Sequence, residues 1–403
     1  MNFKHQQSLS LLVDVSSLRA PLTGVGRYVL EILTQIPEQV EVRGFNDYRR
    51  YEPSALKAFL SSFDKPKSKL ASYQSPAQSR IRPLAKQFIK RVPGSRQLRT
   101  QLQNRRIRDC LAQNKEGVYW QPNFILGKSK TPSMVTVYDL SHVRFPDFHP
   151  LERLRWLQRG LAQSLDDSDH IMTVSEFSKA EIIDVYGIPA EKVSVVYPGV
   201  SNAFHHTYNL DELAEVKKKY SLPAQYVLSL GTFEPRKNLK NLVRAYAMLS
   251  SSLRKRYPLV LAGGQGWKHS ETDSLIGQLQ NRGELIRLGY VDQWDLPLLY
   301  QGASAFAYVS FYEGFGMPVA EAMASGTPVI TSANSSMEEV ALGCAQLVEA
   351  RDVDSITQGL SYVLENAHAL HTRCDRARER SSKYNWSLSA EKLLETACKI
   401  SFK

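Results

Sequence analysis

The sequence FYEGFGMPVAE, residues 311–321, joins two segments of different character. The segment before it, residues 303–310, is short, apolar and rich in β-forming residues, which predicts a buried strand. Gly314 and Gly316 indicate a tight turn at which the backbone can approach a ligand closely. Pro318 is typical of the first turn of a helix, so a helix is expected to begin here.

Two carboxylates flank this turn. Glu313 lies at the carboxyl end of the predicted strand, and Glu321 lies one helical turn into the next element, at the ligand-binding edge of an open α/β sheet. The pair can hold hydroxyl groups at two ends of one ligand. The amides of Phe315, Gly316 and Met317, at a helix N-terminus, can meet an anionic or hydroxyl-rich group between them. A solvated helix glutamate beside a loop glutamate is the alternative.

The order Glu, seven residues, Glu around Gly-Phe-Gly-Met-Pro resembles the signature of the retaining glycosyltransferases of family 4. The resemblance implies an α/β protein with the GT-B fold, in which two Rossmann-like, doubly wound domains face each other across a cleft. In that family the first glutamate contacts the transferred sugar and the second contacts the nucleotide ribose. The resemblance therefore gives Glu313 a catalytic role and Glu321 a nucleotide-binding role.

A second motif, GTFEPRKN at residues 231–238, separates a predicted strand from a predicted helix. Two cations at a helix N-terminus oppose the helix dipole by about 0.3–1 kcal/mol each unless an anion is held there. We expect Arg236 and Lys237 to neutralise the departing diphosphate of a nucleotide sugar, unless they are solvated surface cations. The motif resembles the family's diphosphate-binding turn, although Thr232 stands where many members carry arginine.

Further site residues follow from the same resemblance. Residues 134–138 predict a strand whose end often carries His-Asp in the family, with the histidine close to the reacting sugar. Here Tyr138 replaces that histidine, and either Tyr138 or the nearby His142 is left to take its role. Asp139 keeps the matching position and is expected on the acceptor side. Glu339 matches a family loop that approaches the donor.

The amino-terminal part begins with a predicted strand at residues 9–15, a glycine-containing loop and a helix over residues 25–36. Strand, loop and helix form the first unit of a doubly wound domain. Backbone amides around Gly24 and Gly26 can face a phosphate or an acceptor, as the family's loop does, or the segment is a plain turn.

No metal site is expected. Asp-x-Asp occurs at residues 167–169, directly before a predicted strand, and at residues 352–354, where Asp352 is placed as a helix cap. The resemblance agrees, because GT-B enzymes typically use side-chain cations and a helix dipole in place of Mg²⁺. The predicted co-substrate is a nucleotide diphosphate sugar, a GDP-sugar rather than a UDP-sugar, and no other cofactor is expected.

Positive charge is concentrated in one interval. The net charge is +11, and residues 65–108 hold thirteen lysines and arginines without an acidic residue. Within it, residues 81–91 form a basic amphipathic pattern that suits an anionic lipid surface, here the inner membrane surface. The positive charge of this interval is also compatible with binding of a phosphorylated acceptor, or with a solvated basic loop. Nucleic acid is not expected, because the interval has few aromatic residues for base stacking.

The remaining composition is that of an ordinary globular protein of two or three domains. The four cysteines lie far apart, which argues against a disulfide framework or a zinc site and fits a reducing compartment. We see neither a signal peptide nor a membrane-spanning stretch, and expect a cytoplasmic protein that can touch a membrane peripherally.

Alternating strands and helices predict parallel sheets with helices on both faces. We expect an N-terminal acceptor-binding domain at residues 1–200 and a C-terminal nucleotide-sugar domain at residues 201–385, with residues 202–223 as the connection. A terminal helix at residues 386–403 is expected to cross back onto the first domain, as the resemblance implies.

The predicted function is retaining transfer of a hexose, first mannose or a related deoxyhexose, to a hydroxyl of a growing, lipid-diphosphate-linked glycan. Two alternatives stay open at this point. One is a GT-B nucleotide-sugar epimerase or phosphorylase, although no phosphate or pyridoxal motif supports a phosphorylase. The other is a non-catalytic protein that binds anionic lipid or polymer.

Overall fold

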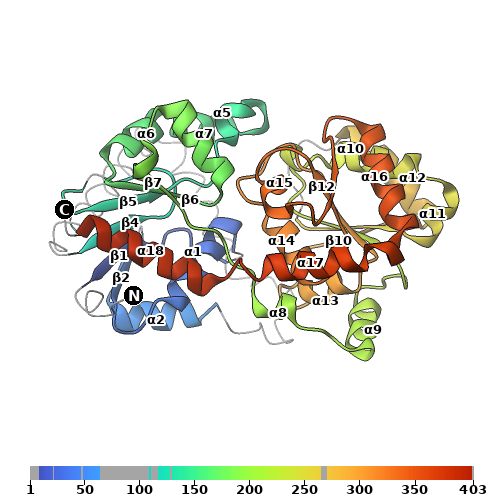
Figure 1. Ribbon diagram of the computed structural model, residues 1–403, viewed down its shortest axis with the longest axis horizontal. Coiled ribbons are helices and arrows are strands. Elements are labelled where there is room, and N and C mark those ends of the chain that lie inside the picture. The colour runs from blue at the N-terminus through green and yellow to red at the C-terminus, as the bar shows by residue number, and fades with distance from the viewer. Residues whose placement is uncertain are drawn as a thin grey trace, which may run out of the picture. The chain divides into compact units, whose positions relative to one another are not determined.

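The computed structural model describes residues 9–20, 22–46, 49–63, 109, 117–127, 129–264 and 270–401. Over these residues strands and helices alternate, and the strands form two sheets (Figure 1). The predicted α/β class with parallel sheets is confirmed. The basic interval at residues 65–108, with its expected amphipathic segment at residues 81–91, lies outside the described residues.

The first sheet has seven strands among the described residues, in the order β3-β2-β1-β4-β5-β6-β7. Strand β3 pairs with β2 in antiparallel fashion, and β1 pairs in parallel with β2 and β4. Strands β4, β5 and β6 continue the parallel arrangement. The strands are β1 (Ser10–Asp14), β2 (Glu41–Phe45), β3 (Arg50–Tyr51), β4 (Val118–Gln121), β5 (Ser133–Thr136), β6 (His170–Thr173) and β7 (Val193–Val195).

The helices of this half begin with α1 (Gly24–Gln35), which forms because Thr23 caps it and an apolar face is available for burial. The Thr23 side chain accepts a hydrogen bond from the Gly26 amide, and Tyr28 and Ile32 are buried. The other helices are α2 (Pro53–Ser61), α5 (Ser141–Arg144), η3 (Pro146–Phe148), α6 (Leu151–Asp167), α7 (Glu176–Tyr186) and η4 (Ala190–Lys192).

The second sheet has six strands among the described residues, in the order β10-β9-β8-β11-β12-β13, and every pairing is parallel. Both faces are covered, so its strands are almost continuously apolar. The strands are β8 (Val227–Leu230), β9 (Leu259–Ala262), β10 (Leu285–Gly289), β11 (Ala305–Tyr308), β12 (Val329–Ser332) and β13 (Gln346–Val348).

Two groups of helices cover the two faces of this second sheet. Helices α10, α12 and α16 bury their apolar faces with alternate strand residues such as Ala305 and Ala307, and they lie together in Figure 1. On the other face the Phe306 ring packs against Tyr300 of α13, and α13 packs against α14. The helices are α8 (Asn202–His205), α9 (Leu210–Lys219), η5 (Pro235–Lys237), α10 (Leu239–Met248), α11 (Ser251–Arg256), α12 (Ser270–Asn281), α13 (Leu296–Gln301), α14 (Met317–Ala324), α15 (Ser336–Ala341), α16 (Val353–Glu365), η6 (Ala367–Leu370), α17 (His371–Ser381) and α18 (Trp386–Ser401).

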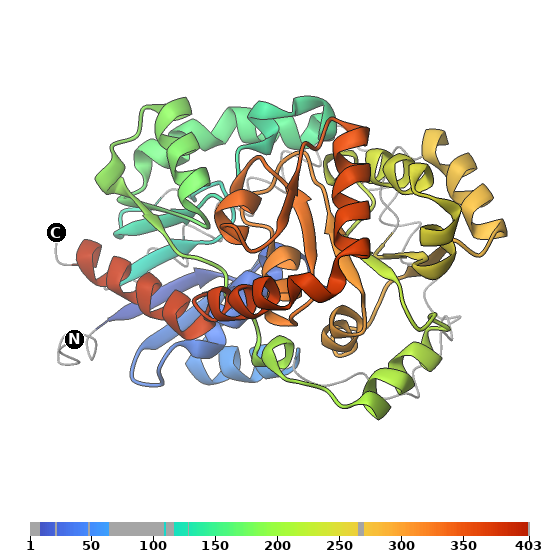
Figure 2. The same ribbon diagram turned by 45° about the vertical axis from the view of Figure 1, so that its right-hand side comes forward.

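Contacts between Cα atoms divide the chain into two compact units. The first comprises residues 1–137, 159–172 and 390–403, and the second comprises residues 138–158 and 173–389. Figure 2 shows the strands of the second unit with helices around them. We expected domains at residues 1–200, 201–385 and 386–403. These bounds follow the fold rather than the contacts between Cα atoms, and they stay a prediction.

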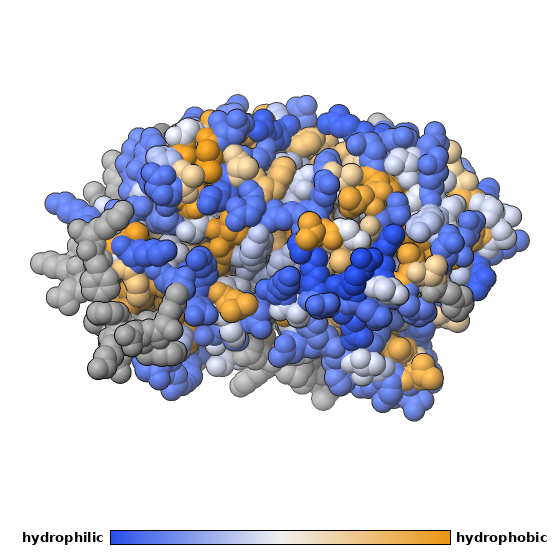
Figure 3. Space-filling view, viewed as in Figure 1, coloured by the Kyte–Doolittle hydropathy of each residue, from blue (hydrophilic) through white to orange (hydrophobic). Residues whose placement is uncertain are grey.

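Large apolar side chains are exposed at separate places, among them Leu151, Leu210 and Tyr290. On the face that Figure 3 draws, hydrophobic residues occur in small groups among hydrophilic ones. Among the helices of the described residues, none has the length and apolar character needed to cross a membrane.

Candidate functional site

The turn after β11 is held in place by two glycines. A Cβ atom at Gly314 would lie 2.0 Å from the backbone oxygen of Tyr138, so only glycine fits there. Gly316 has a φ of 92°, a left-handed conformation that favours glycine, and it directly precedes α14. The expected close approach at this turn is therefore present, and it is an approach to the chain's own backbone at Tyr138.

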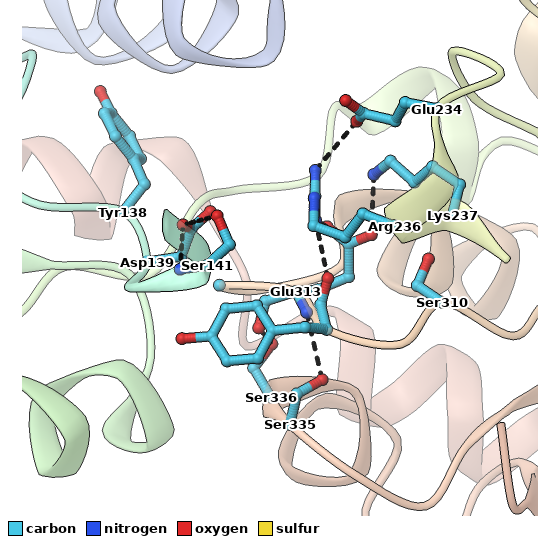
Figure 4. Close-up of polar contacts among 12 residues, drawn as sticks. Tyr138, Asp139, Ser141, Glu234, Arg236, Lys237, Ser310, Glu313, Ser335 and Ser336 are labelled. Carbon is cyan, nitrogen blue, oxygen red and sulfur yellow. Dashed lines mark hydrogen bonds and ion pairs between the residues drawn. The ribbon is translucent and has the colours of Figure 1, made fainter. Parts of the chain in front are cut away.

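Glu313 forms the centre of a polar cluster (Figure 4). Its Oε2 accepts a hydrogen bond of 2.7 Å from Nη1 of Arg236. Its Oε1 accepts one of 2.7 Å from Nζ of Lys237 and one of 2.9 Å from the Tyr308 hydroxyl. The Glu313 side chain is 9% exposed, so both ion pairs lie largely out of water.

The cations reach Glu313 because η5 places them at the carboxyl ends of β8 and β11. Arg236 Nη1 also donates to the Tyr312 carbonyl at 2.7 Å, and Arg236 Nη2 pairs with Glu234 at 3.1 Å. The backbone of Arg236 accepts a hydrogen bond from the Phe311 amide. These contacts tie the Arg236–Lys237 turn to the loop that carries Glu313.

Electrostatics keep this cluster charged. Burial alone would raise the pKa of the Glu313 carboxyl, but the charges of Arg236 and Lys237 and their hydrogen bonds outweigh it and lower that pKa to about 2. Burial acts against the Arg236 charge, yet Glu313, Asp139 and Glu234 raise its pKa overall. Burial lowers the pKa of Lys237, and Glu313 offsets part of that effect.

These contacts change one step of the sequence argument. Two adjacent cations before α10 were expected to require an anion at this position. The structure supplies one from the chain itself, because Glu313 pairs with both cations. Arg236 and Lys237 therefore do not need a phosphate to balance their charge, and a diphosphate at these residues stays a prediction.

Glu321 lies in α14 and is buried. Its Oε2 accepts a hydrogen bond of 3.1 Å from the Tyr300 hydroxyl of α13. The Phe315 ring packs between Tyr197 and Tyr384, with ring centroids 6.1 Å and 5.1 Å away. At the N-terminus of α14, residues 315–317 carry the backbone amides proposed to meet an anion; contacts to a nucleotide stay a prediction.

Asp139 is fixed by a local turn. Its Oδ1 accepts hydrogen bonds from the amide and the hydroxyl of Ser141, at 2.9 Å and 2.6 Å. In Figure 4 the Tyr138 ring points away from Glu313. His142 is buried in α5, and burial lowers its pKa to about 4, so it is neutral near pH 7. Neither Tyr138 nor His142 is assigned the family histidine's role by this geometry.

Glu339 of α15 contacts another helix. Its carboxylate accepts hydrogen bonds from the amides of Glu176 and Phe177 at 3.0 Å and 2.9 Å, and from the Tyr197 hydroxyl at 2.7 Å. A carboxylate at the N-terminus of α7 is favoured by the helix dipole. These contacts do not involve the donor, so the expected contact of Glu339 with the donor stays a prediction.

Gly24 and Gly26 belong to the first unit, at the N-terminus of α1. A Cβ atom at Gly26 would lie 2.7 Å from the Ser17 carbonyl oxygen, whereas one at Gly24 would meet open space. Gly26 therefore has a packing reason to be glycine. Gly24 is the position at which the backbone is accessible.

Sequence reasoning missed two members of the cluster. Tyr308 is the last residue of β11, and its hydroxyl contacts both Lys237 and Glu313. Glu234 precedes η5 and pairs with Arg236. The feature of the sequence that could have indicated them is their position, because both residues lie beside the carboxyl end of a predicted strand.

The arrangement can hold an electron-rich group in a largely dry, charged environment. Two cations lie side by side, and the Glu313 carboxylate, whose pKa they lower, can accept hydrogen bonds from hydroxyl groups. Within the described ranges, no group of three or more His, Cys, Asp or Glu side chains is placed to hold a metal ion.

Comparisons with known proteins identify the family of this chain. The model described as Glycosyltransferase Family 4 matches residues 22–204, and the model described as Glycosyl transferases group 1 matches residues 212–383. An Escherichia coli protein, O-antigen chain mannosyltransferase B, is 32% identical over 393 residues, covering 96% of this chain and 100% of the relative. The O-antigen chain mannosyltransferase RfbU of Salmonella typhimurium LT2 is 31% identical over 222 residues, covering 55% of this chain and 58% of the relative.

Solved structures show the same fold at low sequence identity. Anabaena HepE in complex with UDP and glucose has a TM-score of 0.66 at 16% identity, covering 96% of this chain and 99% of its own. WaaG, a glycosyltransferase involved in lipopolysaccharide biosynthesis, has a TM-score of 0.63 at 14% identity, with 96% and 99% covered. The chain therefore belongs to glycosyltransferase family 4 and is a hexose-transferring enzyme with the GT-B fold.

Proposed function

We propose that this enzyme transfers mannose from GDP-mannose to a hydroxyl of a growing polysaccharide, with retention of configuration at the transferred carbon. The observation that carries the proposal is the 32% identity to the Escherichia coli O-antigen chain mannosyltransferase B, which extends over the whole of that relative. The Salmonella relative, also an O-antigen chain mannosyltransferase, supports the same sugar. The identities of the transferred sugar, the nucleotide base and the acceptor are all part of this proposal.

In the proposed reaction the bond between the anomeric carbon and the diphosphate oxygen breaks, and a bond to the acceptor oxygen forms on the same face of the sugar. The acceptor proton passes to the departing phosphate oxygen. Arg236 and Lys237 compensate the charge that develops on the diphosphate. Because Glu313 is ionised and centrally placed between them, it accepts hydrogen bonds from sugar hydroxyls rather than acting as an acid.

The other predicted residues have supporting roles in this proposal. Glu321 binds the ribose, and the amides of Phe315, Gly316 and Met317 face the anionic part of the donor. Asp139 lies on the acceptor side. Its influence on the charge of Arg236 is consistent with a position near the cluster.

We place the reaction in the cytoplasm, at the inner surface of the membrane, with a lipid-diphosphate-linked glycan as acceptor. The support is the positive charge of residues 65–108 and the polysaccharide-related names of the relatives. Transfer is favoured over donor epimerisation by the matching relatives. Incubation of the donor without acceptor separates the two, because only an epimerase returns an epimerised nucleotide sugar.

The experiment is a panel of GDP-mannose, GDP-fucose, UDP-glucose and UDP-N-acetylglucosamine, tested by thermal shift and by transfer to an α-mannoside. GDP-mannose is expected to raise the melting temperature, because a ligand at 100 times its Kd stabilises the folded state by about 2.7 kcal/mol. Stabilisation and transfer with a UDP-sugar alone would overturn the GDP-mannose proposal. A product with inverted configuration would overturn retention.

A further inference from the structure

A pocket of about 270 Å³ opens beside the loop that carries Glu313. It is lined by Phe145, Phe148, Asn241, Phe311 and Arg351. None of these five residues has a role in the proposed transfer step. The proposed transfer step therefore does not account for this pocket.

Its wall is a row of three phenyl rings. Phe145 and Phe148 are stacked with centroids 5.5 Å apart and planes 7° apart, and Phe148 and Phe311 are stacked at 5.7 Å and 25°. All three side chains are half-buried. Leaving aromatic surface in water costs about 25 cal/mol per Å², so a row of such rings is a favourable surface for an apolar face of a ligand.

Polar groups complete the pocket. The exposed Arg351 places its guanidinium carbon 5.9 Å from the Phe145 ring centroid and 6.0 Å from that of Phe311. Asn241 donates from Nδ2 to the Ala350 carbonyl at 3.1 Å, an arrangement that fixes its amide. Aromatic surface with a few oriented polar groups is typical of a small-molecule site.

The pocket is mechanically joined to the Glu313 cluster. The Phe311 amide donates to the Arg236 carbonyl at 2.9 Å, and the Arg236 guanidinium holds the Tyr312 carbonyl and Glu313. Phe311 and Glu313 are separated by one residue. A molecule in the pocket therefore lies next to the residues that are proposed to hold the reacting sugar.

The pocket and Glu321 lie on opposite faces of the second sheet. Asn241 belongs to α10 and Arg351 lies two residues before α16, and these two helices pack together on one face. Glu321 belongs to α14, which packs against α13 and α17. A nucleotide whose ribose is bound by Glu321 therefore has its base away from this pocket.

We propose that the pocket binds one hexose unit of the acceptor glycan, beyond the unit whose hydroxyl reacts. The C–H face of the pyranose packs on the phenyl row, and its hydroxyls contact Arg351 and Asn241. This inference rests on the proposed function and adds a second glycan subsite to it. Its consequence is a preference for acceptors that already carry several hexose units.

The test uses the variants Phe148→Ala and Arg351→Gln with α-mannosides of one to five mannose units, each on a short and on a long alkyl aglycone. Each variant is expected to raise KM for the longer acceptors roughly fivefold to tenfold, and to leave KM for the shortest acceptor, KM for the donor and kcat unchanged. The same acceptors are titrated by NMR against the protein without donor, where the wild type binds long acceptors more tightly than the variants do.

Matched controls are Tyr362→Ala and Arg373→Gln, because Arg373 lies 6.0 Å over the Tyr362 ring in an equivalent arginine–aromatic contact outside the pocket. Neither control is expected to change any KM. Equal acceptor KM values for wild type and pocket variants would overturn the inference. So would a loss that follows alkyl length instead of mannose number, or a raised donor KM. Absence of transfer by the wild type would instead count against the proposed function, and the NMR titration would still decide on the pocket.

Discussion

At the scale of single residues, Glu313 has both a structural position and a proposed catalytic role. It is the shared partner of two cations, and Arg236, Lys237 and Glu313 are each less than a fifth exposed. Removal of one charge from a buried ion pair leaves the other charges without compensation. A substitution here is therefore expected to change stability and catalysis together, and a control is needed to separate them.

For Glu313→Gln we expect kcat to fall roughly 100-fold or more, because the substitution removes the charge that pairs with both cations and the oxygens proposed to accept sugar hydroxyls. The free energy of unfolding should also fall by about 3 kcal/mol. The control is Glu284→Gln, since Glu284 is buried and pairs with Arg254 at 2.9 Å away from the cluster. It should lose stability with an unchanged kcat; an equal loss of kcat in both variants would show that Glu313 acts only through folding.

For His142 we predict an effect on the pH dependence of the free energy of unfolding. Burial, together with His149 and Arg153, lowers its pKa from 6.5 to about 4, against the opposing effect of Asp139. Between these values the unfolded chain binds a proton that the folded chain does not. The free energy of unfolding should therefore fall as pH is lowered from 6.5 to 4, by at most about 1.4 kcal/mol per pH unit from this residue.

Urea unfolding at pH 7, 6 and 5 measures this slope. His142→Gln should make it shallower, whereas replacement of the exposed His371 by glutamine should leave it as in the wild type. An unchanged slope in His142→Gln would mean that His142 is not the residue that titrates.

Single residues also show which parts of the candidate site could be predicted from the sequence. Glu313 was predicted at the carboxyl end of one strand, and Arg236 and Lys237 between another strand and its helix. These three residues form one cluster, because the carboxyl ends of parallel strands meet at one sheet edge. Which residues pair with which was not predictable, since that depends on side-chain directions. Tyr308 was missed for this reason, as it reads only as the end of an apolar strand.

At the scale of elements, the start of α14, whose backbone amides are proposed to face the donor, depends on Gly316. The φ of 92° costs a side-chain-bearing residue about 1–2 kcal/mol, and a Cβ atom would lie 3.1 Å from Met337 Cγ. For Gly316→Ala we expect this loss of stability together with weaker donor binding, because the amides at the start of α14 are displaced.

Calorimetric titration with the donor measures the second effect. Gly187→Ala is the matched control: Gly187 ends α7 with a φ of 64°, and a Cβ atom there meets open space. It should show the conformational cost without a change in donor affinity. If Gly316→Ala binds donor as the wild type does, the start of α14 does not contact the ligand.

Sequence patterns located most elements of the second sheet, because a covered parallel strand is a short apolar run with helical segments on either side. The predicted strand at residues 303–310 is β11 (Ala305–Tyr308), and the helix expected after Pro318 is α14. The segment at residues 202–223, predicted only as a connection, contains α8 and α9. The capping box of Asn209 and Glu212 that starts α9 was the readable signal.

At the scale of the whole molecule, the distribution of charge and apolar surface bears on membrane contact. Thirteen positive charges fall within residues 65–108, against a net charge of +11. On the face drawn in Figure 3, apolar residues are dispersed among hydrophilic ones. Binding to a lipid surface is therefore expected to be electrostatic, at about 1 kcal/mol per basic residue near the surface, and weakened by salt.

This prediction is tested by co-sedimentation with liposomes that contain or lack anionic lipid. Charge reversal of Lys86, Lys90 and Arg91 to glutamate should abolish binding to anionic liposomes at low salt, and the wild type should bind neutral liposomes weakly. The control reverses three exposed lysines elsewhere, Lys218, Lys255 and Lys383, and so changes the net charge equally. If both triple variants lose binding alike, total charge matters and the basic interval does not. If neither variant loses binding, the basic interval is not the membrane-binding segment, while transfer to a water-soluble mannoside remains as an independent measure of the enzyme.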